Sequence, residues 1–168
     1  MSSSVLVGYA TQYGSTQEVA EAIGDTLREA GLNVDVRPVK EVGDLAEYSA
    51  VVLGAPLMKS RFHKDAQNFL KRQRQALSER PVSVFALGPV KEPHDEEEWE
   101  SSRAQLDKQM KEFPWLTPSA VELFGGKFDP ATLPFPLNKL AGKEPASDAR
   151  DWEAIRSWAS DLKTILAA

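Results

Sequence analysis

The sequence contains no cysteine and only two histidines, His63 and His94, among its 168 residues. Without cysteine there are no disulfides, thiolate metal sites, cysteine-held iron–sulfur clusters or cysteine nucleophiles, so any redox chemistry must use a bound cofactor. Two histidines are too few for a histidine-rich metal site, and we expect no metal. The chain also lacks an apolar run of about 18 residues, the length of a membrane-spanning helix, and the basic, apolar start of a secretory signal.

The sequence has fewer basic than acidic residues. The formal net charge is −5 at pH 7, which argues against nucleic acid as a partner. Apolar residues make up 42% of the chain and charged residues 27%, an ordinary globular composition. We therefore expect one domain over residues 1–168, in the cytoplasm, without an integral membrane span and with peripheral membrane contact left open.

Short apolar runs alternate with segments of helical periodicity. Continuous runs, such as residues 5–10 and 50–54, are typical of strands buried on both faces of a sheet. Residues 32–36 instead alternate apolar and polar side chains, as a half-exposed edge strand does. The predicted strands lie at residues 5–10, 32–36, 50–54, 82–87 and 120–124, and the predicted helices at 15–30, 66–77, 97–113 and 152–166.

This alternation predicts an α/β fold, a parallel sheet covered by helices on both faces. Right-handed crossovers, with the alternating strand at an edge, give the strand order 2-1-3-4-5. Ligands of such sheets bind beyond the carboxyl ends of the strands, near the switch point between the first and third strands. We expect Ser15 and Glu18 to form a capping box for the first helix, and Ser147 or Asp148 to cap the last.

The loop after the first strand has the chemistry of a phosphate site. Four of its six residues carry hydroxyl groups and none is basic, and the next helix adds backbone N–H groups and its dipole. Such a loop suits a phosphate monoester that is held permanently, and it lacks the Walker lysine and the three spaced glycines of a dinucleotide site. A turn that only caps the helix is the alternative. The candidate residues are Thr11, Gln12, Tyr13, Gly14, Ser15 and Thr16.

This loop and the order of strands resemble the flavodoxin family, most clearly over residues 5–87. Residues 53–55, 61–63, 124–129 and 151–153 are similar to the branch of that family that contains menaquinone-dependent protoporphyrinogen dehydrogenase. The resemblance implies a flavodoxin-like three-layer sandwich that binds FMN, with its phosphate in the first loop. It places two further segments beside the flavin ring: Ala55, Pro56, Leu57 and Met58, and Leu87, Gly88, Pro89 and Val90.

The resemblance implies an FMN-dependent oxidoreductase that works with a redox partner or a small planar substrate such as a porphyrinogen or a quinone. The cations Lys59 and Arg61 beside the flavin would stabilise its anionic reduced form, which favours an enzyme over an electron carrier. Backbone N–H groups of the turn at residues 88–90 would face the flavin, and the apolar residues 133–137 could cap it. Two alternatives stay open, an electron carrier and a flavin-free interaction module. No catalytic residue is assigned.

Overall fold

The computed structural model describes residues 4–11, 14–58, 61–129 and 146–166. Its central sheet has the strand order β2-β1-β3-β5-β6, and each neighbouring pair is parallel. Chain order and sheet order therefore agree with the prediction, since β5 and β6 are the predicted fourth and fifth strands. The five strands are β1 (Ser4–Tyr9), β2 (Asn33–Pro38), β3 (Tyr48–Met58), β5 (Val82–Leu87) and β6 (Ala120–Phe124).

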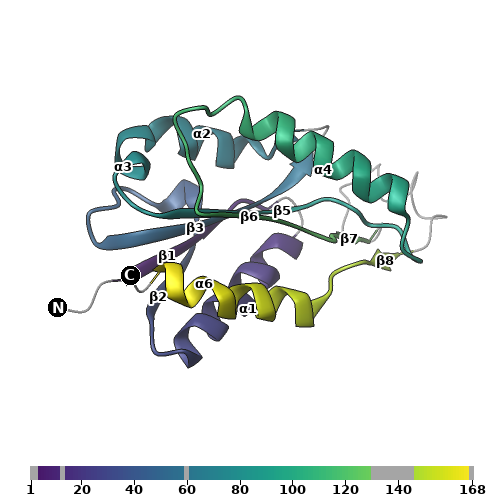
Figure 1. The fold of residues 1–168 in the computed structure, drawn as a ribbon, viewed down its shortest axis with the longest axis horizontal. Coiled ribbons are helices and arrows are strands. Elements are labelled where there is room, and N and C mark those ends of the chain that lie inside the picture. Colours follow the sequence, from purple (N-terminus) through teal and green to yellow (C-terminus); the bar gives the residue numbers. More distant parts are fainter. Residues whose placement is uncertain (1–3, 12–13, 59–60, 130–145, 167–168) are drawn as a thin grey trace.

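Helices cover both faces of the sheet, which confirms the three-layer sandwich (Figure 1). One face carries α1 (Ser15–Glu29) and α6 (Trp152–Leu166), which also pack on each other. The other face carries α2 (Lys64–Arg72), α3 (Arg74–Ser78) and α4 (Glu96–Met110). Each interface is a core of buried apolar side chains. A short 3-10 helix, η1 (Val39–Glu41), follows β2.

The predicted helix at 66–77 is interrupted. Gln73 ends α2 and precedes α3, with backbone angles of −101° and 17°. Its side-chain amide donates a hydrogen bond of 2.8 Å to the carbonyl oxygen of Gly43, a contact thirty residues away in sequence. The break between α2 and α3 thus coincides with a contact to a residue distant in sequence. Helical periodicity alone cannot predict such a break.

The predicted strand at residues 50–54 is longer in the structure, because β3 continues to Met58. Ala55 and Pro56 pair in parallel with Ala86 and Leu87, so the strand stays in the sheet well beyond residue 54. The end of β3 then pairs antiparallel with β4 (Arg61–Phe62). The residues expected to line a ligand therefore stand on a strand, which holds them more rigidly than a loop would.

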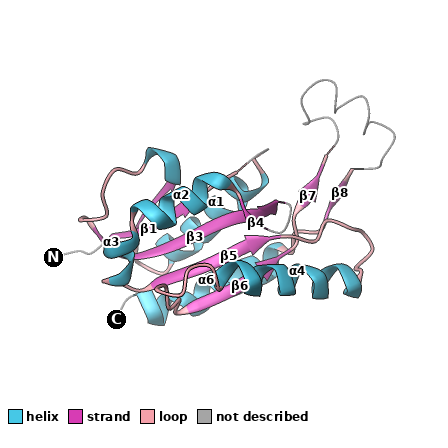
Figure 2. Cartoon of the chain, turned by 90° about the horizontal axis from the view of Figure 1, so that it is seen from above, coloured by secondary structure: helices cyan, strands magenta, loops and turns pink. Residues whose placement is uncertain are grey.

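A second, small sheet was not expected. Strand β7 (Lys127–Phe128) pairs antiparallel with β8 (Ser147–Asp148), and the pair extends beyond the carboxyl ends of the main strands (Figure 2). The expected cap of α6 at Ser147 or Asp148 is wrong for this reason. Asp151 takes that role, since its carboxylate accepts the backbone N–H of Ala154 at 3.1 Å.

Candidate functional site

The loop before α1 is shaped by Gly14, the N-cap residue of the helix. Its φ of 93° is left-handed backbone that side-chain-bearing residues rarely adopt. The hydroxyl of Thr11 accepts the N–H of Gly14 at 2.8 Å and closes the turn. The N–H of Glu18 donates to the Gly14 carbonyl, so the N–H groups of residues 15–17 precede the helical ladder. These groups form an anion-binding helix end.

The predicted capping box of Ser15 and Glu18 is wrong, because Gly14 is the cap and makes no side-chain cap bond. Glu18 instead pairs with an arginine from the other end of the chain, Arg150, at 3.0 Å. Gln12 and Tyr13 lie outside the described residues.

Thr16 carries the clearest sign of a ligand in this loop. The residue is fully buried, and its hydroxyl has no hydrogen-bond partner among the described residues. A buried hydroxyl without a partner costs about 1–3 kcal/mol. A phosphate oxygen at the helix end would supply an acceptor for it. The donor set of hydroxyls and backbone N–H groups therefore fits a phosphate monoester.

Arg150 stabilises this loop, a role that was not predicted from the sequence. Its guanidinium donates to the Ser15 carbonyl at 3.3 Å and to the Glu18 carboxylate at 3.0 Å. Two further bonds of 2.9 Å reach the carboxylate of Asp148 on β8. The guanidinium also lies 4.7 Å from the ring centre of Trp152. Hydrogen bonds to the Asp148 carboxylate raise the pKa of Arg150, and the same bonds lower the pKa of Asp148.

A pocket of about 150 Å³ lies at the predicted switch point. Residues from the three predicted segments line this pocket together. This volume is below the roughly 300–1,000 Å³ of common ligand pockets, so the described residues form the floor of a site rather than a closed cavity. We call it the switch-point pocket, and its lining residues are Ser15, Pro56, Leu57, Met58, Leu87, Gly88, Val90, Gly126 and Lys127.

Five predicted residues are not among the lining of this pocket although they are described. Thr11, Gly14 and Thr16 belong to the phosphate loop beside it. Ala55 is buried within β3, and Pro89 is buried with its carbonyl accepting the N–H of Gly126 at 2.6 Å. Ala55 and Pro89 therefore support the walls of the pocket without lining it.

The turn after β5 does not present its N–H groups as expected. The Glu98 carboxylate accepts the N–H groups of Val90 and Lys91, each at 3.1 Å. The N–H of Gly88 donates to the Phe124 carbonyl at 3.1 Å. These donors are already used in folding the turn, so a ligand meets other surfaces of it. Glu98 is thus a structural residue of this turn.

The structure describes only some of the remaining residues expected near the ligand. Lys59 and residues 133–137 lie outside the described residues. Arg61 is exposed on β4, opposite Met58. His63 is buried and caps α2, where its Nδ1 accepts the N–H of Asp65 at 3.1 Å.

Together these features define an α/β protein with a phosphate-type loop beside a flat pocket at the switch point of a parallel sheet. Residues 6–137 match the family model described as a flavodoxin domain, and the chain belongs to the flavodoxin-domain family.

Two similar proteins and one solved structure show where the chain stands in this family. The chain is 26% identical to the protoporphyrinogen IX dehydrogenase [quinone] of Leishmania major, over 95% of this chain and 74% of that protein. It is 32% identical to the NAD(P)H dehydrogenase (quinone) of Rhodopseudomonas palustris, over 39% of this chain and 44% of that protein, so it spans less than half of that relative. A flavodoxin from the domain Archaea superposes with a TM-score of 0.61 at 15% identity, covering 98% of this chain and 99% of the other.

In the part of the chain that the structure describes, no helix is long and apolar enough to cross a membrane.

Proposed function

We propose that this chain binds FMN without a covalent bond and is an FMN-dependent oxidoreductase acting on a quinone or a porphyrinogen. The observation that carries the proposal is the phosphate-type loop beside the switch-point pocket, where the buried Thr16 hydroxyl has no hydrogen-bond partner among the described residues. The names of the two relatives support the redox assignment, since both refer to a quinone.

Different residues of the chain would hold the phosphate and the ring of the flavin. The hydroxyls of Thr11, Ser15 and Thr16 and the N–H groups at the start of α1 would hold the phosphate. Pro56, Leu57 and Met58 from β3 would border one side of the ring, and Leu87, Gly88 and Val90 the other. FAD does not suit this loop, because it lacks the glycine spacing that admits a pyrophosphate.

A bound flavin would supply two-electron chemistry, the transfer of a hydride from a donor such as a dihydronicotinamide to a quinone, with one proton from water completing the hydroquinone. The apolar walls of the pocket would exclude water from the ring, and the rigid end of β3 would fix its plane.

The test uses two glycines that share a backbone conformation. Gly14 has φ +93° and Gly31 has φ +95°, and the site of an added Cβ is open at both. Leucine therefore strains both positions alike, but only Gly14→Leu places a side chain on the phosphate loop. We expect the parent protein and Gly31→Leu to bind one FMN per chain and Gly14→Leu to lose it, as measured by visible absorbance and by chromatography of the released chromophore.

Each result has a separate meaning. Retention of stoichiometric FMN by Gly14→Leu would refute the phosphate site. A parent protein that stays colourless with added FMN would favour the flavin-free module. A yellow protein that neither reduces a quinone with a hydride donor nor oxidises a porphyrinogen with a quinone as acceptor would favour the electron carrier.

A further inference from the structure

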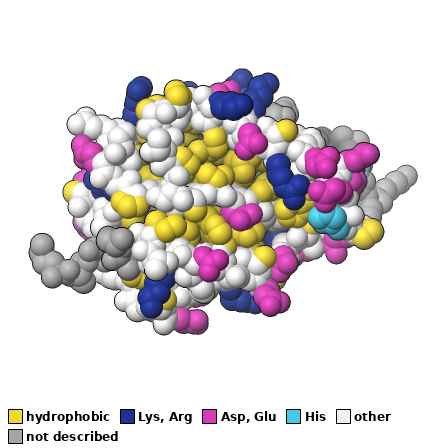
Figure 3. All heavy atoms as spheres, viewed as in Figure 1, with side chains coloured by type: hydrophobic (Ala, Val, Ile, Leu, Met, Phe, Trp, Pro, Cys, Tyr) yellow, Lys and Arg dark blue, Asp and Glu magenta, His cyan; other side chains and the backbone are white. Residues whose placement is uncertain are grey.

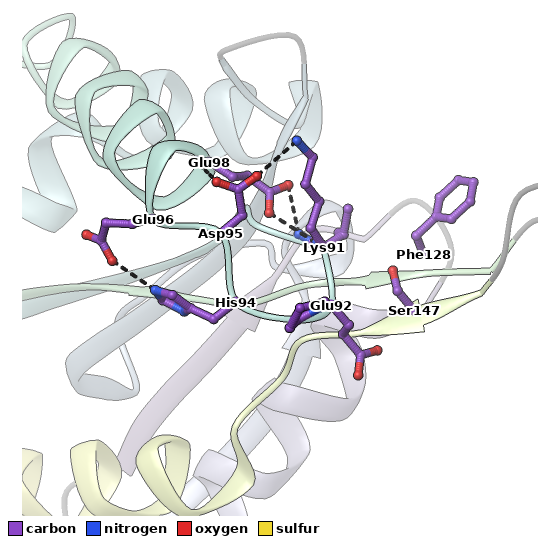
Figure 4. Close-up of a pocket in the computed structure, with 10 residues that line it drawn as sticks. Lys91, Glu92, His94, Asp95, Glu96, Glu98, Phe128 and Ser147 are labelled. Carbon is purple, nitrogen blue, oxygen red and sulfur yellow. Dashed lines mark hydrogen bonds and ion pairs between the residues drawn. The ribbon is translucent and has the colours of Figure 1, made fainter.

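A larger cleft opens beside the switch-point pocket, on the far side of the turn after β5. Its volume is about 900 Å³, within the usual range for ligand sites. One wall is the segment that leads from β5 into the first turn of α4, and the opposite wall is the β7–β8 pair (Figure 4). We call it the acid-lined cleft. Its lining residues are Val90, Lys91, Glu92, Pro93, His94, Asp95, Glu96, Glu98, Phe128 and Ser147.

The cleft adjoins the place where the flavin ring would lie. Val90 lines both the cleft and the switch-point pocket, so the two share a wall. Phe128 and Ser147 stand across the cleft from Lys91 in Figure 4. A planar molecule seated against Phe128 and Val90 would therefore approach the flavin from the side of β7 and β8.

The lining contains four carboxylates and one ammonium group, that of Lys91. The pKa values of Asp95 and Glu96 lie below the ordinary range, mainly because Lys91 donates to the former and His94 hydrogen-bonds the latter. These groups are therefore anionic at neutral pH. Figure 3 shows acidic side chains gathered beside a histidine at this end of the molecule.

Most of these carboxylates have structural partners, which fixes the charge in place. Glu98 holds the turn after β5, and Asp95 caps α4 by accepting the N–H groups of residues 97 and 98. Glu92 accepts the backbone N–H of Asp148 on β8. Glu96 pairs at the surface with His94 at 2.8 Å and with Arg103 at 3.2 Å. A cleft with one dominant sign of charge repels ligands of that sign.

We propose that the acid-lined cleft is the substrate subsite of this oxidoreductase, and that it selects an uncharged planar quinone over a porphyrinogen, whose side chains carry carboxylates. The inference rests on the proposed function and chooses between its two substrate classes. Val90, Pro93 and Phe128 supply the apolar surface for the quinone rings. The fixed carboxylates supply the discrimination against anions.

The experiment compares two naphthoquinones that differ chiefly in charge, neutral menadione and anionic 1,4-naphthoquinone-2-sulfonate. Binding is followed by backbone amide shifts in the flavin-free protein, with Lys91, Phe128 and Ser147 as reporters. Reduction is followed in the FMN-loaded protein with a dihydronicotinamide as donor. We expect menadione to be preferred about tenfold in both measurements, and the preference to shrink when salt shortens the Debye length from about 10 Å to 3 Å.

Glu96→Lys is the informative variant, because Glu96 lines the cleft and takes no part in folding the turn after β5. Glu97→Lys is the matched control, since it makes the same charge change in the same first turn of α4 at an exposed residue that is not among the lining residues. We expect Glu96→Lys to reduce the menadione preference at least about threefold relative to Glu97→Lys.

Equal binding of both quinones by the parent protein would overturn the inference. So would menadione shifts confined to the switch-point pocket, or equal effects of the two lysine substitutions. Failure of the proposed function looks different: FMN would not bind and no quinone would be reduced, while the flavin-free amide shifts would still report on the cleft.

Discussion

Replacing Arg150 with methionine should loosen the phosphate loop and the β7–β8 pair together. The side chain is 4% exposed and bridges Ser15 and Glu18 at the start of α1 to Asp148 on β8. Methionine keeps much of the apolar stem and removes the planar fork of donors, which only arginine offers in this geometry. Lysine at the same position keeps the charge without the fork, and it should give an intermediate result.

The magnitude follows from the contacts. A hydrogen bond to a charged group contributes about 1.5–3 kcal/mol to stability. The partner side chains Asp148 and Glu18 are 40% and 56% exposed, so water screens the pairs and rehydrates the carboxylates after the substitution. We therefore expect Arg150→Met to lower the free energy of unfolding by about 2–3 kcal/mol in total. For a chain of this size, that lowers the Tm by about 4–12 °C.

The assay pairs thermal unfolding with FMN titration, and Arg28→Met is the control. Arg28 also binds a backbone carbonyl and a carboxylate, Val34 and Asp25, but at the opposite end of α1. Both substitutions should lower the Tm, whereas only Arg150→Met should weaken FMN binding, by about tenfold or 1.4 kcal/mol. If Arg150→Met left both the Tm and the Kd for FMN unchanged, or if Arg28→Met weakened FMN equally, the bracing role would be refuted.

Two further predictions concern single side chains. Thr16→Val should stabilise the flavin-free protein by about 1 kcal/mol, because it removes a buried hydroxyl without a partner, yet it should weaken FMN binding about tenfold. Ser83→Ala removes a second buried hydroxyl, on β5, that has no hydrogen-bond partner among the described residues, and it should stabilise the protein without changing the Kd for FMN. Equal flavin affinity in both variants would count against the phosphate role of Thr16. Asp148→Asn should destabilise at neutral pH. Because the folded pKa of Asp148 is lowered, its contribution is present above the unfolded value near 4 and fades as pH falls through the folded pKa; a stability difference from the parent that persists at about pH 2 would contradict this.

Local sequence was enough to predict the sheet, and it located the loop that we propose as the phosphate site. Residues 5–9 of β1 are all buried, as a continuous apolar run requires, and the alternating residues of β2 lie at the edge of the sheet. Hydroxyl-rich residues around Gly14 lie where a strand meets a helix, so their chemistry and position could be inferred together. These features depend on neighbours within a few residues.

The residues that were missed depend on distant partners. Arg150 meets Ser15 across 135 positions in sequence, and no periodicity or motif reports such a contact. The continuation of β3 through Pro56 depends on its partner Leu87, since a proline followed by a short apolar stretch ordinarily indicates a loop. The role of Glu98 could not be predicted either, because its contact with Val90 depends on the geometry of the loop.

The β7–β8 pair links the phosphate loop to the acid-lined cleft through one residue, Asp148. Its carboxylate is held by Arg150, which reaches the carbonyl of Ser15, while its backbone N–H donates to Glu92 in the cleft. Backbone bonds fix the same segment to the main sheet, since Ala149 donates to Gly126 at 2.9 Å. The phosphate loop and the β7–β8 wall of the cleft therefore cannot shift independently without breaking charge-assisted hydrogen bonds. Both proposed sites therefore depend on the β7–β8 pair, the phosphate loop through Arg150 and the cleft through Phe128 and Ser147.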